Sequence, residues 1–193
     1  IIYVTGRDAY DSFGGKMKNC EIGISDFLDA IELSKDKSID VNYVADVTKQ
    51  DRLVCGYGYD RKIELKVWSK EKGWIYMIVI DGAVEKIGQS DASLSSRFSS
   101  YQAGTEANRG RGTCSVTNYH VSRRFRDALK RGSEIKIYAA KVPETSTMLE
   151  ILGEPMEVRN KHAYAYEKKL LELYQKLSID GSMPPLCRNT SLT

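Results

Sequence analysis

Tyr76 and Lys86 form the first pair of side chains whose types and spacing could do chemistry. Tyr76 lies in the middle of an apolar run, residues 74–80, and Lys86 lies in a second short apolar segment. The Asp81-Gly82 turn between them predicts a β-hairpin, whose strands can bring the phenol and the ammonium close together. A nearby ammonium favours a phenolate, which could accept a proton at neutral pH. Taken singly, a strand tyrosine is usually packing and a strand lysine usually a solvated charge.

Arg97 and Glu167 place charges on helical stripes that should face a core. Arg97 lies between Leu94 and Phe98 on such a stripe. A guanidinium there extends to solvent, pairs with a local carboxylate, or meets a specific anion. Glu167 lies three residues before Leu170 and among other apolar neighbours. This carboxylate is therefore either paired with a base or bound to a cation.

The elements that must position these side chains follow from hydrophobic periodicity and turn residues. A helix capped by Ser90 or Asp91 carries Arg97, and a second, capped by Ser115 or Thr117, follows a polar loop over 105–116. The sequence predicts strands at 74–80, 84–87 and 135–140 and helices at 25–33, 91–103, 117–131 and 161–177. It further predicts a strand at 63–68 and turns at 55–60. The expected fold class is α/β in the α+β sense, a small antiparallel sheet flanked by helices, with residues 1–70 as an accessory region and 71–193 as the core.

Composition and charge narrow the class of protein. The chain has 193 residues, 41% hydrophobic and 28% charged, as in ordinary globular domains. No run of about 18 apolar residues and no signal-peptide pattern occurs, so we expect no membrane partner and a cytoplasmic (intracellular) location. The cysteines are scattered without a CxxC pair, which favours reduced thiols over structural zinc; they are Cys20, Cys55, Cys114 and Cys187.

Several of these residues together resemble one nuclease family. Gly73-Trp74-Ile75-Tyr76, Lys86-Ile87-Gly88, Arg97 and Glu167 are similar in type and order to the motifs of the GIY-YIG nuclease superfamily. Among its members the chain most resembles small type II restriction endonucleases, whose second motif can read Lys-Ile-Gly. The resemblance spans residues 73–177 and includes the segment 112–119. Lys86 stands where most of the superfamily has a second tyrosine, and no role is carried onto Asn189.

The resemblance implies one-metal hydrolysis of a phosphodiester bond. Glu167 would be the protein ligand of Mg²⁺, or of Mn²⁺ in its place, and Arg97 would clamp the scissile phosphate. Tyr76 would act as general base, with Lys86 favouring its deprotonated form. Gln89 would position the attacking water. The expected substrate is double-stranded DNA, cleaved at a specific sequence by a homodimer with one active site per strand.

The net charge of +3 hides a basic segment that suits this partner. Residues 97–131 hold eight basic and two acidic side chains, a local charge of +6, whereas 1–70 and 144–193 are slightly acidic. Arginines suit phosphates and guanine edges. The side chains expected to contact DNA are Arg109, Arg111, Thr113, Ser115, Thr117, Asn118, Arg123, Arg124 and Arg126, the last three through the backbone unless they form a plain solvated helix face. Residues 1–70 would supply dimer contacts or embrace the DNA.

Two other functions fit parts of the sequence. Asp46 followed by Glu64-x-Lys66 matches the short Asp…Glu-x-Lys pattern of another class of restriction nucleases, and Glu134-x-Lys136 offers a second Glu-x-Lys. A DNA-binding module without catalysis would use the same basic segment. The joint presence of Tyr76, Lys86, Arg97 and Glu167 argues against that module.

Overall fold

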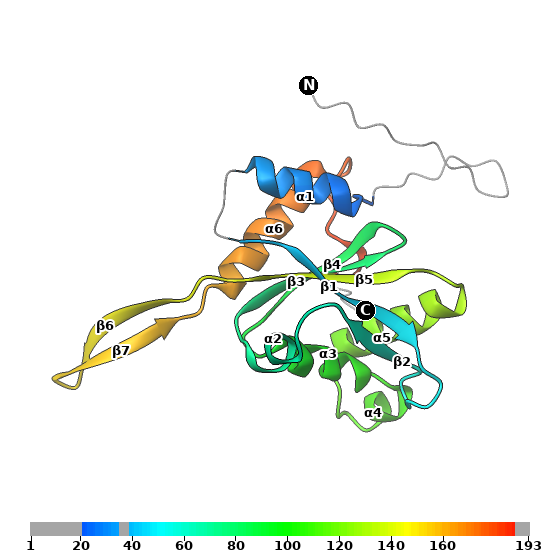
Figure 1. Cartoon of the computed structure of the whole chain (residues 1–193), viewed down its shortest axis with the longest axis horizontal. Helices are drawn as coiled ribbons and strands as arrows, with labels where there is room; N and C mark the ends of the chain where they lie inside the picture. The colour runs from blue at the N-terminus through cyan, green and yellow to red at the C-terminus, as the bar shows by residue number, and fades with distance from the viewer. Residues whose placement is uncertain (1–20, 35–38, 188–193) are drawn as a thin grey trace.

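The computed structural model describes residues 21–34 and 39–187 (Figure 1). Its helices are α1 (Ile24–Leu33), α2 (Leu65–Lys70), α3 (Leu94–Gln102), α4 (Glu106–Gly110), α5 (Val116–Lys130) and α6 (Ala163–Leu177), with a 3₁₀ turn, η1 (Pro185–Cys187). Its strands are β1 (Asn42–Lys49), β2 (Tyr57–Arg61), β3 (Trp74–Ile80), β4 (Ala83–Ser90), β5 (Ile135–Lys141), β6 (Thr145–Ile151) and β7 (Glu154–Asn160).

Five strands form one antiparallel sheet in the order β2-β1-β5-β3-β4, and β6 and β7 form a separate hairpin. Every residue of β3 is buried, because β3 has strands on both sides and helices over both faces. β4 is an edge strand. A β-bulge interrupts its pairing with β3 between Ile78 and Val79.

Helices cover both faces of the sheet, so side chains that alternate along β3 enter two different cores. Tyr76 and Ile78 pack with Phe98 of α3 and Phe125 of α5. On the opposite face, residues such as Met77 pack against α1 and α6. Figure 1 shows α1 and α6 on one side of the sheet and α2 to α5 on the other.

The predicted fold class is confirmed, and so are its main elements. The hairpin of β3 and β4, the helices α1, α3, α5 and α6 and the strand β5 all lie where the pattern indicates. Ser115 is the cap of α5, accepting a hydrogen bond from the backbone N–H of Asn118 at 3.1 Å. The cap of α3 is Ser93, which accepts from Ser96 at 3.2 Å, so neither Ser90 nor Asp91 has this role.

Other elements differ from expectation. The alternating segment 63–68 is mainly the helix α2 rather than a strand, because Trp68 stacks on Phe98 with ring centroids 5.5 Å apart. The turn predicted at 55–60 contains much of β2, and the loop predicted at 105–116 contains α4. β1 and the hairpin of β6 and β7 were not predicted. Tertiary pairing decides these segments, whose local patterns are weak or misleading.

The segment 39–70 belongs to the same sheet as the predicted core, through the pairing of β1 with β5. Its expected role in dimer contacts or in embracing DNA stays a prediction, as do the domain boundaries, and residues 1–20 lie outside the described ranges. Within those ranges, no helix combines the length and apolar composition that crossing a bilayer requires.

Candidate active site

Tyr76 is held in place by the hairpin of β3 and β4. It is opposite Gly88 in the register and only 1% exposed. A Cβ atom at residue 88 would lie 2.5 Å from the Tyr76 hydroxyl oxygen, far inside contact distance. The glycine of the Lys86-Ile87-Gly88 segment is therefore required, because the phenol passes directly over its backbone.

Arg97 meets two tyrosines rather than solvent or a carboxylate. Its Nε donates to the Tyr76 hydroxyl at 2.7 Å and its Nη2 donates to the Tyr101 hydroxyl at 3.0 Å. The two hydroxyl oxygens are themselves 2.6 Å apart and hydrogen-bonded. Both tyrosines are buried and the guanidinium is half-buried, so the three side chains form one rigid polar network at the edge of the core.

Tyr101 is a further member of this network and is not among the residues predicted for the site. It lies four residues after Arg97 on α3, so the two side chains share a helical face. The guanidinium carbon also lies 4.7 Å from the centre of the Tyr101 ring. The spacing from Arg97 to Tyr101 was the available signal, since a buried phenol needs a hydrogen-bond partner.

The cation beside the Tyr76 hydroxyl is Arg97, and this corrects the expectation that Lys86 has that place. Lys86 is opposite Ile78, two residues from the Tyr76–Gly88 pair. Burial raises the pKa of Tyr76, while the charge of Arg97 and the hydrogen bonds from Tyr101 and Arg97 oppose the rise. The charge that acts most strongly on the Tyr76 hydroxyl is therefore that of Arg97.

Glu167 approaches from the other face of the sheet, on α6. Burial raises the pKa of its carboxyl, and the charges of Lys86 and Arg97 and the backbone N–H of Gln89 oppose the rise. None of the ion pairs within 4.0 Å found among the described residues includes Glu167. A half-buried carboxylate that faces two cations without being neutralised by either is free to bind a further ligand.

Lys86 is enclosed by the C-terminal turn η1. It is 7% exposed, and its Nζ donates to the backbone oxygen of Leu186 at 3.3 Å. The thiol of Cys187 donates to the oxygen of Ile87 at 3.1 Å and accepts from its N–H at 3.3 Å. Cys187 thus pairs with the open edge of β4 as a neighbouring strand would, and the turn covers Lys86. Sequence reasoning did not identify this contact, which joins residues a hundred positions apart.

Gln89 presents a buried oxygen without a partner. Its Oε1 makes no hydrogen bond within the described part of the chain. Because Gln89 is opposite Ile75, its side chain lies on the α6 face, away from Tyr76. Side chains from the two faces of the sheet can meet only past its edge strand, which is β4 here. We name Tyr76, Lys86, Gln89, Arg97, Tyr101 and Glu167 the β4-edge site; Asn189 lies outside the described residues.

The side chains predicted to contact DNA divide into two groups. Arg124 is ion-paired with Glu85, which is 2% exposed, and Arg126 donates to Gly104 at 3.2 Å and to Ser122 at 2.8 Å. The side chains of Arg124 and Arg126 therefore make contacts within the protein. Arg123 remains largely exposed, with a 3.8 Å contact to Asp127 and a side-chain hydrogen bond to Tyr119.

The remaining predicted DNA contacts lie on α4 and the start of α5. Arg111 donates to Asn108 at 2.7 Å, and Arg109 makes a 3.5 Å contact with the backbone oxygen of Cys114. The hydroxyl of Thr113 donates to the backbone oxygen of Asn108 at 3.1 Å. Thr117 is exposed, while the Ser115 hydroxyl and the Asn118 N–H are joined in the cap of α5. Their contact with DNA stays a prediction.

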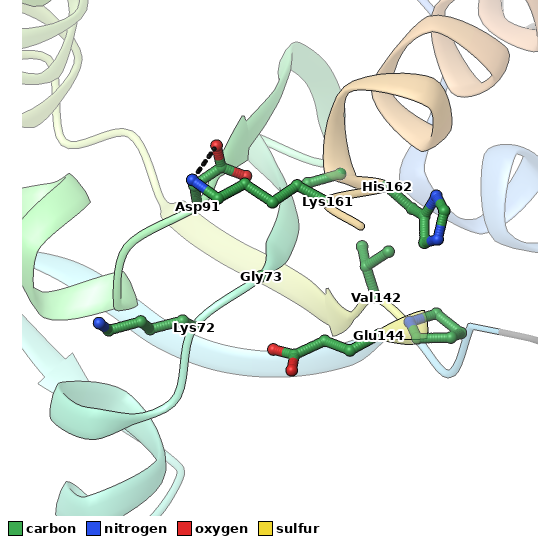
Figure 2. Close-up of a pocket in the computed structure, with 9 residues that line it drawn as sticks. Lys72, Gly73, Asp91, Val142, Glu144, Lys161 and His162 are labelled. Atoms are coloured by element: carbon green, nitrogen blue, oxygen red, sulfur yellow. Dashed lines mark hydrogen bonds and ion pairs between the residues drawn. The ribbon is translucent and has the colours of Figure 1, made fainter. Parts of the chain in front are cut away.

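A cavity of about 150 Å³ lies next to the start of β3 and the ends of β4 and β5, and no residue of the β4-edge site lines it (Figure 2). Its lining includes Lys72, Asp91, Lys161 and His162, and Lys161 is ion-paired with Asp91 at 3.3 Å. We refer to it as the root cavity, because the hairpin of β6 and β7 leaves the body there.

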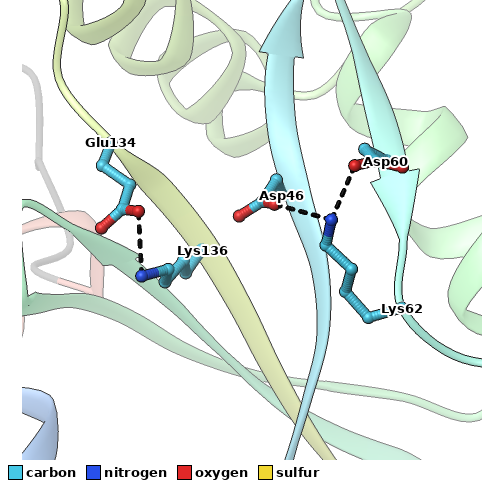
Figure 3. Close-up of polar contacts among 5 residues, drawn as sticks. All are labelled: Asp46, Asp60, Lys62, Glu134 and Lys136. Carbon is cyan, nitrogen blue, oxygen red and sulfur yellow. Dashed lines mark hydrogen bonds and ion pairs between the residues drawn. The ribbon is translucent and has the colours of Figure 1, made fainter.

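The alternative catalytic set does not assemble around Asp46 (Figure 3). The cation on Asp46 is Lys62, at 3.1 Å, and Lys62 also binds Asp60 at 2.7 Å. Glu64 and Lys66 lie at the exposed start of α2.

The second Glu-x-Lys lies beside Asp46, since Lys136 is its partner in the register of β1 and β5. Lys136 is however ion-paired with Glu134 at 2.9 Å. Among the described residues, no group of three acidic, histidine or cysteine side chains could hold a metal. We name Asp46, Asp60, Lys62, Glu134 and Lys136 the lysine-paired cluster.

Comparison with known proteins finds no matching family model and no matching curated protein. The similar solved structures include the following two. The restriction endonuclease HPY188I in complex with product DNA is 26% identical, with a TM-score of 0.52 over 88% of each chain. A mutant of bacteriophage T4 EndoII is 18% identical, with a TM-score of 0.53 over 81% of this chain and 96% of that one, a likeness of fold.

Proposed function

We propose that this chain is a DNA endonuclease, specifically a type II restriction enzyme of the GIY-YIG superfamily that cuts double-stranded DNA at a defined sequence. One observation carries the proposal. The Tyr76–Arg97–Tyr101 network and the carboxylate of Glu167, which forms no ion pair among the described residues, approach the β4 edge from opposite faces of the sheet. The similarity to restriction endonuclease HPY188I supports the nuclease class. Four residues that resemble the family's motifs are gathered at one sheet edge, which supports the finer assignment.

Glu167 has the properties that a single-ligand divalent metal site requires. It is a carboxylate in a half-buried place, its pKa is raised by burial, and no ion pair among the described residues occupies it. Mg²⁺, or Mn²⁺ in its place, would supply Lewis-acid stabilisation of the scissile phosphate and of the leaving 3′ oxygen. Burial raises the pKa of Glu167, and the charges of Lys86 and Arg97 and the N–H of Gln89 oppose this rise, because all three favour the ionised form.

Arg97 and Tyr76 act on the other side of the reacting phosphate. The guanidinium of Arg97 binds a phosphate oxygen and offsets the charge that grows in the transition state. Tyr76 accepts the proton of the attacking water, and the adjacent guanidinium favours the phenolate that this role needs. Gln89 would position that water where the two faces of the sheet meet at the β4 edge, through its Oε1, which has no hydrogen-bond partner among the described residues.

DNA binding falls to the exposed basic residues around α4 and the outer side of α5. Arg109, Arg111 and Arg123 are exposed in the structure, whereas Arg124 and Arg126 are engaged internally, so we leave these two out. A homodimer is proposed because two-fold symmetry matches a site cut on both strands.

The proposal is tested by incubating DNA with Mg²⁺ and the wild type, Glu167→Ala or Glu64→Ala. Discrete fragments from the wild type and from Glu64→Ala, but none from Glu167→Ala, are expected. Loss of cleavage only in Glu64→Ala would sink the proposal in favour of the Asp46 class. Wild-type binding without cleavage, across several metals and substrates, would indicate a non-catalytic DNA-binding module.

A further inference from the structure

The hairpin of β6 and β7, which we call the arm, is amphipathic. Its register places Leu149 opposite Met156 and Thr147 opposite Val158, and side chains two residues apart share a face. Leu149, Ile151, Met156 and Val158 therefore share one largely apolar face, which also carries Glu154, opposite Ile151 near the tip. The other face carries Glu150, Glu157, Ser146, Met148 and Pro155.

Among the described residues, little covers the apolar face of the arm. Every residue of β6 is exposed, and Figure 1 shows the arm extending away from the body along the long axis. Leu149 is 47% exposed and Met156 is 53% exposed. A two-stranded hairpin by itself is only marginally stable in water, and its apolar face needs a covering partner.

The tip of the arm combines an exposed apolar side chain with an unfavourable backbone conformation. Leu152 is 100% exposed and adopts φ of 56°, in the left-handed region that disfavours a branched side chain. A large aliphatic group held in solvent at a strained turn is expected to be buried by a binding partner.

The net negative charge of the arm disfavours nucleic acid as that partner. Residues 145–160, which make up the arm, contain three glutamates, at 150, 154 and 157, and one arginine, at 159, a net charge of −2. Such a segment repels a polyanion, since DNA binding depends on neutralising phosphates with basic side chains. The partner is therefore a protein surface that is apolar with a basic end.

The apolar face of the arm and the root cavity together form such a surface, apolar with a basic end. Thr145 shares the apolar face with Leu149 and is hydrogen-bonded to His162 at 2.6 Å, so the root cavity opens at the end of the same face. The cavity lining includes Val142, Pro143 and Ala163 as well as the exposed Lys72 (Figure 2). A cavity of about 150 Å³ accepts a benzene-sized group, and hence a leucine side chain.

We propose that the arm binds the arm of a second copy of this chain, apolar face to apolar face and antiparallel. The tip of each arm then reaches the root of the other. Leu152 of one copy enters the root cavity of the other copy, and Glu154 contacts Lys72, which lines that cavity. Glu150 and Glu157 stay on the outer faces, so the two acidic arms do not repel each other across the contact. A two-fold contact of this kind needs only one self-complementary patch, which the arm supplies.

The area of the contact sets its strength. Two seven-residue strands measure roughly 23 Å by 10 Å, so pairing two such faces buries roughly 500 Å² before the tips are added. This is below the ~1,000 Å² typical of stable interfaces. The free protein therefore dimerises weakly and in a concentration-dependent manner. The inference relies on the proposed function only for the expectation of two-fold symmetry.

Sedimentation of the full chain over a range of concentrations, without DNA or metal, tests the proposal. The wild type should pass from monomer to dimer, and Leu149→Asp should raise the dissociation constant by ~10-fold or more. Met148→Asp is the matched control, because it adds the same charge to the neighbouring residue on the other face and should leave the constant unchanged. A wild type that stays monomeric, or a dimer insensitive to Leu149→Asp, overturns the proposal.

A charge exchange tests the antiparallel arrangement. Glu154→Lys and Lys72→Glu should each weaken association, and the double variant should restore it. Equal weakening in the single and double variants contradicts the tip-to-root pairing. Cleavage is measured separately: a chain that cuts DNA but never dimerises overturns only this inference, and a dimer that cuts no DNA overturns only the proposed function.

Discussion

The β4-edge site and the lysine-paired cluster contain similar side chains arranged to opposite effect. In the cluster, Asp46 is 3.1 Å from Lys62 and Glu134 is 2.9 Å from Lys136. At the β4 edge, Glu167 faces Lys86 and Arg97 without such a pair, and Arg97 donates to hydroxyl groups instead. The charges of the lysine-paired cluster neutralise one another, whereas Glu167 and Arg97 of the β4-edge site form no ion pair among the described residues.

The pKa values of the two carboxylates show the same difference. Burial alone would raise the pKa of Asp46, but hydrogen bonds from Tyr43 and Lys62 outweigh it, and the net shift is downward. For Glu167 burial outweighs the two distant cations, and the net shift is upward. Asp46 is thus held by partners within the fold, whereas Glu167, half-buried and outside any ion pair among the described residues, is the better candidate for a functional carboxylate.

The largest effect should come from removing the unpaired charge. Glu167→Gln keeps the size of the side chain and should lower the cleavage rate by ~10³-fold or more, because metal-dependent stabilisation is worth several kcal/mol. Asp46→Asn, the matched change in the lysine-paired cluster, should leave the rate unchanged. Single-turnover cleavage of plasmid DNA measures both. Equal losses in the two variants would mean that the contrast between the sites has no functional meaning.

Loss of the proposed base should be somewhat smaller and pH-dependent. Tyr76→Phe should lower the rate by ~10²-fold or more. Because burial raises the pKa of Tyr76, the phenolate fraction of the wild type, and with it the rate, should climb as pH rises above neutral.

The pH profile also tests the role of Arg97. The charge of Arg97 lowers the pKa of Tyr76, so Arg97→Gln should displace the rising limb to higher pH as well as reduce the rate. Lys66→Gln on the exposed α2 serves as control. A flat profile in the wild type would contradict the assignment of Tyr76 as base.

A third contrast separates arginines that hold the fold from those proposed to hold DNA. Arg124→Ala leaves the carboxylate of Glu85 buried without its partner and should destabilise the chain by about 3 kcal/mol. Arg123→Ala should leave stability unchanged, weaken binding to all DNA sequences and flatten its salt dependence. Urea denaturation and binding titrations at several salt concentrations measure the two effects. Relaxed specificity at one base pair in Arg123→Ala would contradict a phosphate contact.

The smallest expected effect concerns the turn that covers Lys86. Cys187→Ala removes both hydrogen bonds to Ile87 and should lower kcat several-fold, by ~1 kcal/mol for the lost contacts. Cys187→Ser retains a donor and an acceptor and should recover most of the rate. Identical kcat and KM in all three proteins would show that η1 has no part in positioning Lys86.

Short-range patterns were sufficient for the hairpin of β3 and β4 and for the helices that carry Arg97 and Glu167. Asp81-Gly82 is a strong turn signal, and the apolar spacing of Leu94, Phe98 and Tyr101 matches one helical face. The same reasoning failed at 63–68, where a period of two occurs in a helix. It also missed the arm, whose strands are stabilised by their mutual pairing rather than by a core.

The sequence by itself determined which charged side chains would stand on apolar faces, because burial of a charge without a partner is unfavourable whatever the fold. It also determined where the basic residues are concentrated. Only the tertiary structure decided the partners: that Tyr76 meets Arg97 and Tyr101 rather than Lys86, and that η1 covers Lys86. Such contacts depend on strand register and on how helices cross the sheet. These are set by packing between segments that are distant in the chain, so no local pattern records them.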